Sequence, residues 1–179
     1  MLSRILLSAI ASLVASPCIA MVFVVGDLAQ ERDIRSELLF AGTRGPIPTI
    51  IRAEPGPGTA TAVIETLGHW SDGGGIKFAA AARDAALPDG YFVVFVFNQP
   101  RRIQGSNLCS GSYAAQSPQA GASLNVSAAF CLRDFPLTSA YGSTGAAENQ
   151  DSAMRQLVSA VASVLFPRTG LPSAGNSTM

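Results

Sequence analysis

The chain has 179 residues, of which 48% are hydrophobic, and its formal net charge is zero. Twelve basic residues balance twelve acidic ones, and neither sign forms a run. A nucleic-acid-binding protein needs a concentrated basic face to release counterions from phosphates, so we expect no nucleic-acid partner.

The N-terminal segment predicts export or membrane insertion. Arg4 is followed by an uncharged, apolar stretch over residues 5–25. One interpretation is a signal peptide over residues 1–20, cut after Ala20, because Cys18 and Ala20 supply the small residues that a signal peptidase requires. The other is an uncleaved membrane anchor over residues 5–25, since a helix of that length spans the roughly 30 Å hydrocarbon core.

Both interpretations stay open. Pro17 favours cleavage because it ends helical order just before the cut, whereas the apolar run that continues to Val25 favours an anchor that contacts the membrane. Lipid attachment at Cys18 is a third alternative, disfavoured because Pro17 takes the place of the usual small residue. In every case the remainder of the chain lies outside the cytoplasm, in the periplasm or secreted.

The next residues divide into a spacer, one domain and a tail. Residues 27–45 predict a spacer with a short amphipathic helix that ends at Gly42 and Gly45. A single α+β domain is expected over residues 46–167. The tail, residues 168–179, is rich in Gly, Pro, Ser and Thr and predicts disorder.

Within the domain, the pattern alternates between strands and helices. In chain order we expect a strand at 48–53, a helix at 59–67 ended by Gly68, a short edge strand at 76–80, a central strand at 91–97, a polar loop at 105–121, a half-buried strand at 124–132, a strand at 137–141 and a helix from Asn149, its N-cap, to Phe166. The prediction is an α+β fold: a small antiparallel sheet of about four strands with two helices packed on one face, preceded by the signal or anchor helix.

Three cysteines occur. If Cys18 leaves with the signal or sits in the membrane, Cys109 and Cys131 remain, and an even pair in an oxidising compartment predicts a structural disulfide. It would contribute roughly 3 kcal/mol by closing its loop. A redox or metal-binding pair is the alternative, but the chain has no Cys-x-x-Cys motif and its one histidine, His69, is distant in sequence.

Several segments together show a resemblance to a known group of proteins. They are residues 88–98 (PDGYFVVFVFN), Leu108-Cys109, residues 128–131 (AAFC), residues 137–142 (LTSAYG) and residues 165–167 (LFP). Over residues 48–167 the chain resembles a family of small, uncharacterised bacterial exported proteins, similar to lipoproteins. The resemblance implies an envelope location and no established activity.

No residue is assigned to catalysis, to a cofactor or to a metal. His69 follows a short helix, without a Gly-x-Ser-x-Gly motif elsewhere to pair with it. The glycines at 73–75 precede Lys77 but lack the spacing of a phosphate-binding loop. The acidic residues that could form a dispersed acid–base pair are Glu54, Glu65, Asp72, Asp84 and Asp89.

These observations leave three hypotheses of function. The first is a non-enzymatic, exported or membrane-tethered envelope protein that binds an envelope protein partner through a sheet edge or the 105–121 loop. The second is a small hydrolase-like enzyme with a dispersed carboxylate or serine site. The third is a periplasmic domain that binds a small molecule in an apolar groove beneath the two helices. The sequence does not indicate an oligomeric state.

Overall fold

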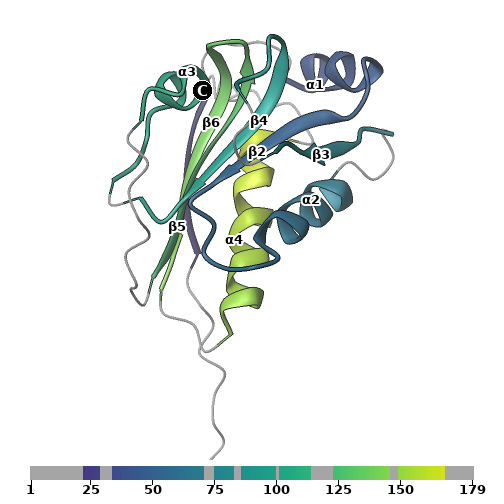
Figure 1. The fold of residues 1–179 in the computed structure, drawn as a ribbon. Helices are drawn as coiled ribbons and strands as arrows, with labels where there is room; N and C mark the ends of the chain where they lie inside the picture. Colours follow the sequence, from purple (N-terminus) through teal and green to yellow (C-terminus); the bar gives the residue numbers. More distant parts are fainter. Residues whose placement is uncertain are drawn as a thin grey trace, which may run out of the picture.

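The computed structural model describes residues 22–28, 34–70, 75–82, 86–99, 101–113, 123–145 and 149–167. Their fold is a mixed sheet with helices on both faces (Figure 1). In chain order the elements are β1 (Val22–Leu28), α1 (Ile34–Thr43), β2 (Ile47–Arg52), α2 (Thr59–Trp70), β3 (Phe78–Ala80), β4 (Tyr91–Phe97), α3 (Gly105–Ser110), β5 (Leu124–Leu132), β6 (Phe135–Thr144) and α4 (Gln150–Leu165).

The expected antiparallel sheet of about four strands is wrong. The sheet has six strands in the order β1-β6-β5-β4-β2-β3, and only part of it is antiparallel. β2 is parallel to both β3 and β4, whereas β4, β5, β6 and β1 are antiparallel in succession. The parallel half arises because α2 returns the chain from the end of β2 to the start of β3, as a crossover between parallel strands must.

The N-terminal helix that was expected to reach Val25 is also wrong for the residues described. Val22–Leu28 is a strand, paired with β6 from Val22↔Thr144 to Leu28↔Thr138. Valine and phenylalanine suit a strand once β6 supplies partners for their backbone groups. Residues 1–21, with Cys18 and the cleavage point, lie outside the described residues, as does the tail 168–179. In the described ranges, every helix is too short or too polar to cross a bilayer.

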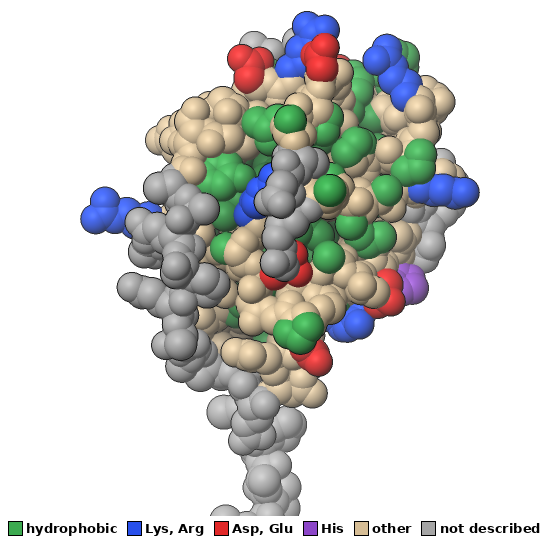
Figure 2. All heavy atoms as spheres, viewed as in Figure 1, with side chains coloured by type: hydrophobic (Ala, Val, Ile, Leu, Met, Phe, Trp, Pro, Cys, Tyr) green, Lys and Arg blue, Asp and Glu red, His purple; other side chains and the backbone are tan. Residues whose placement is uncertain are grey.

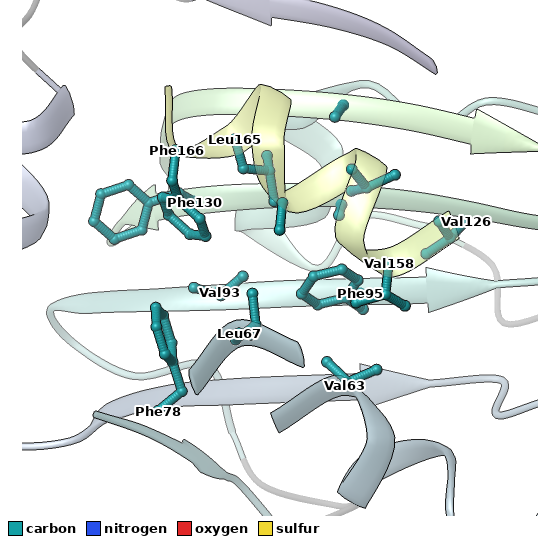
Figure 3. Close-up of a cluster of buried hydrophobic side chains, with 14 of the residues drawn as sticks. Val63, Leu67, Phe78, Val93, Phe95, Val126, Phe130, Val158, Leu165 and Phe166 are labelled. Carbon is teal, nitrogen blue, oxygen red and sulfur yellow. The ribbon is translucent and has the colours of Figure 1, made fainter. Parts of the chain in front are cut away.

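One face of the sheet carries the main core, under α2 and α4. Figure 3 shows side chains from both helices and three strands pointing toward one another: Val63 and Leu67 from α2, Phe78 from β3, Val93 and Phe95 from β4, Val126 and Phe130 from β5, and Val158 and Leu165 from α4, with Phe166 following it. The space beneath the helices, where an apolar ligand groove was one hypothesis, is therefore occupied by packed side chains.

The second face is covered in part by α3. Its Leu108 and Cys109 pack against buried residues of β2, β4 and β5. Residues 105–121, expected as a polar loop, thus begin with a helix. For the same reason β5 is buried on both faces, although its alternation of residues predicted a half-buried strand.

The ends of the helices agree with the predictions in some places and differ in others. Asn149 caps α4, as predicted, because its Oδ1 accepts a hydrogen bond from the Ser152 amide at 3.0 Å. The spacer contains α1, close to the expected amphipathic helix. α2 continues through Gly68 to Trp70, so Gly68 is not its end.

Candidate functional site

The first candidate surface is the outer edge of β1. β1 ends the strand order, and within the described residues no strand pairs with its outer side. Val24 and Gly26 face α4, whereas Phe23 faces the opposite side and is 59% exposed. An edge strand presents unpaired N–H and C=O groups, which form a template for another chain.

This edge lacks the usual protection against pairing. From Val22 to Gly26 it contains neither a charged residue nor a proline, the two commonest devices that block edge-to-edge association. The opposite edge, β3, has only three residues, Phe78–Ala80, and α2 packs beside it. β1 therefore offers the longer edge of the two.

Two glycines position β1 under α4. A Cβ built on Gly26 would collide with Val164, and one built on Gly142 would lie 2.8 Å from Leu157 Cδ1 and 2.9 Å from Val161 Cγ2. These distances are closer than real Cβ atoms approach, so a side chain at either glycine would force the facing side chains of α4 to shift. This role could not be predicted from the sequence, because neither glycine is flanked by a turn or cap pattern.

The second candidate feature is α3, which covers part of the opposite face of the sheet. Cys109 of α3 and Cys131 of β5 form the predicted disulfide, with Cα atoms 5.6 Å apart. Both residues are buried, at 1% and 0% exposure. The Ile103 amide donates to Ser127 Oγ at 3.0 Å, which fixes the segment that leads into α3. Such burial fits a structural bond, because a catalytic disulfide must be reached by another thiol.

Tyr113 lies just after α3 and packs on the same face of the sheet. Burial raises the pKa of the Tyr113 hydroxyl, and the nearby Arg52 guanidinium opposes that shift through its charge and a hydrogen bond. Arg52 ends β2, so this pair joins the cover to the parallel half of the sheet.

A shallow groove of about 650 Å³ lies between α2 and α4 on their solvent side. Its lining residues are Thr66, His69, Arg155, Gln156, Ser159, Ala160 and Ser163. Arg155 Nη1 binds Glu65 Oε2 at 2.9 Å, and the hydroxyls of Thr66 and Ser163 donate to carbonyls of their own helices. Among the described residues, no hydrogen bond joins His69 to a serine hydroxyl.

The acidic residues considered for catalysis do not converge in the part of the chain described. Glu65 pairs with Arg155, and Asp89 pairs with Arg133 at 3.0 Å, with both Asp89 and Arg133 mostly exposed. Asp72 and Asp84 fall outside the described residues, as do the glycines at 73 and 74. Within the described ranges, no group of three or more His, Cys, Asp and Glu side chains could hold a metal ion. Figure 2 shows acidic and basic side chains spread around the margin of the face in view, with hydrophobic side chains between them.

Comparison with known proteins adds likeness of shape only. No family model and no curated protein matches the chain. Two crystal forms of a PelC dodecamer from Paraburkholderia phytofirmans are similar to it. In space group P6 the TM-score is 0.46 at 15% identity. A point variant in space group C2 gives 0.46 at 16% identity. Each comparison covers 83% of this chain and 100% of that chain.

Proposed function

We propose that this protein is an exported or membrane-tethered domain of the cell envelope that acts by binding another protein chain and not by catalysis. The observation that carries the proposal is the outer edge of β1 from Val22 to Gly26, which contains no charge and no proline, with Phe23 exposed on it. Proteins bind extended partners at such edges by adding a strand, with affinity from main-chain hydrogen bonds and specificity from alternate side chains.

Export is supported by two features that are independent of the edge. The apolar segment before β1 has the length and the basic flank of an export signal or anchor. The buried disulfide between Cys109 and Cys131 belongs to the kind that persists in oxidising compartments. The resemblance to small bacterial exported proteins points the same way.

A retained leader would place the edge near a membrane. β1 starts at Val22, directly after the apolar segment. If that segment is retained or lipidated, the edge is held close to the bilayer surface, where it meets other membrane-bound chains at high local concentration.

The test is photo-crosslinking in the envelope of intact cells. A photoreactive phenylalanine analogue replaces Phe23 in the full chain, and the matched control carries the analogue at Phe135, another exposed phenylalanine at a strand end. We expect adducts with a protein chain from position 23 and few from position 135. Equal or absent adducts at both positions would contradict the proposal.

A further inference from the structure

We infer that the chain which pairs with β1 is a second copy of this protein, bound antiparallel about a twofold axis at Val24. The inference rests on the proposed function, because it names the partner of the same edge. It would join two six-stranded sheets into one continuous sheet.

The register follows from charge and length. Centring the axis on Val24 pairs Val22 with Gly26 of the copy, Phe23 with Val25, and Val24 with itself. The whole uncharged stretch then pairs with itself, and Asp27 stays outside the paired region. An axis at Val25 would instead place Asp27 opposite Phe23 in the register, so that a charged residue would fall within the paired stretch.

The side chains fit this register on both faces. Directly opposed residues share a face, so exposed Phe23 would pack against Val25 of the copy, and aromatic–β-branched pairs stabilise antiparallel sheets. On the α4 side, Val22 of the copy would lie over Gly26, which has no side chain to oppose it. The contact with Val25 of the copy would also cover Phe23, the largest exposed apolar side chain of β1.

The helices leave room for the second copy. α4 packs mainly over β6, with β1 on one side and β5 on the other. With strands about 4.8 Å apart, the α4 helices of the two copies would lie roughly 14 Å from each other across the axis. Packed helices approach to 8–10 Å, so the two helices do not collide. α3 contacts Ser139 and Pro136 of β6, away from the axis at Val24.

Cysteine crosslinking tests the register. In the full chain extracted from the envelope, Val24→Cys should form a disulfide-linked dimer on mild oxidation, because directly opposed Cα atoms lie 4.5–5.5 Å apart. Phe23→Cys is the matched control, since its copies would be about 8 Å apart in this register. We expect at least tenfold more dimer from Val24→Cys, while the unmutated chain treated alike reports any contribution of Cys18.

A second variant tests the edge without relying on a thiol. Phe23→Lys places a cation on each side of the axis, and lysine blocks edge pairing in natural sheets. Light scattering during gel filtration should show the dimer dissociation constant raised at least tenfold, with the melting temperature of the monomer unchanged because Phe23 is largely exposed. Phe135→Lys should leave the dissociation constant unaltered.

The outcomes separate this inference from the proposed function. A chain that is monomeric at every concentration and gives no Val24→Cys dimer overturns the second copy as partner. If the photoreactive group at position 23 then captures a different envelope protein, strand addition at β1 still stands. If it captures no protein, both proposals fail.

Discussion

Gly142 and Gly26 let α4 approach the sheet closely, because a Cβ at either position would force a side chain of α4 to shift. At Gly142, a Cβ would lie within 3 Å of Leu157 and Val161, which are both fully buried. Because these side chains are held by the packed core around them, they cannot move aside without disturbing it.

We therefore expect Gly142→Ala to lower the free energy of unfolding by about 1–3 kcal/mol, the usual cost of overpacking a core. Gly145→Ala is the control, since a Cβ there meets nothing within 4 Å. Urea denaturation of the two variants measures the difference. Equal midpoints would show that α4 does not lie on β6 as described.

Tyr113 predicts an alkaline limit to stability. Burial raises the pKa of its hydroxyl, so above about pH 10, the ordinary tyrosine value, the unfolded chain loses this proton before the folded chain does. The stabilisation is complete below that pH and is lost as the pH rises through the folded-state pKa. Tyr113→Phe should flatten the fall of melting temperature above pH 10, measured by circular dichroism. An unchanged slope would contradict the burial of Tyr113.

Single residues with a local signal could be predicted from the sequence. Asn149 was identified as the cap of α4, and Cys109 with Cys131 as a disulfide, because capping and cysteine pairing leave marks in the residues themselves. The importance of Gly142 could not be predicted, because it depends on a helix that passes over it.

Among the elements, α3 is tied to the sheet by a covalent bond as well as by the packing of Leu108. The helix has only six residues, too few to be stable alone, and the disulfide ties it to β5. The bond also keeps Phe92 and Val94, which lie in the same buried cluster as Leu108, covered on the second face.

Removing the bond should therefore destabilise the fold and loosen this cover. For Cys109→Ala with Cys131→Ala, we expect a loss of roughly 3 kcal/mol, from the loop entropy that the bond removes in the unfolded state. Calorimetry measures the loss, and faster hydrogen exchange in Gly105–Ser110 than in α4 would locate it. Uniform exchange through the whole domain would argue that α3 does not depend on the disulfide.

Strands were predicted better than their partners. The run at Tyr91–Phe97 indicated a central strand, and the structure places β4 between β5 and β2. β1 was missed because an apolar run suits a membrane helix as well as a strand, and only β6, far along the chain, decides between them. The parallel pairing of β2 with β4 was missed for the same reason: strand direction depends on the connections.

At the scale of the whole molecule, the sequence predicted the type of binding surface but not its position. A sheet edge was one of two expected binding surfaces, but its place at Val22–Leu28 was missed because this segment overlaps the end of the predicted anchor, residues 5–25, and the start of the predicted spacer, residues 27–45. The balance of charges and the single histidine could be read from composition alone, without knowledge of the fold.

The fate of the leader is a prediction about the whole chain. We expect the envelope-extracted protein to have the mass of residues 21–179, cut after Ala20, with two hydrogens fewer than the reduced chain. Intact mass spectrometry with and without reductant measures both, and Cys131→Ser should abolish the hydrogen difference. A full-length mass would instead favour the retained anchor, and an added acyl mass would favour lipid on Cys18.

The pairing of the first described strand with β6, near the far end of the chain, sets the order in which the protein must assemble. During synthesis, which runs from the N-terminus, β1 is made long before β6 is available to pair with it. Until then, its valines and Phe23 lie open to any holding chaperone or neighbouring nascent chain. Pairing of β1 therefore waits until Phe135–Thr144 has been made, and during that interval the unpaired strand is exposed to misassembly.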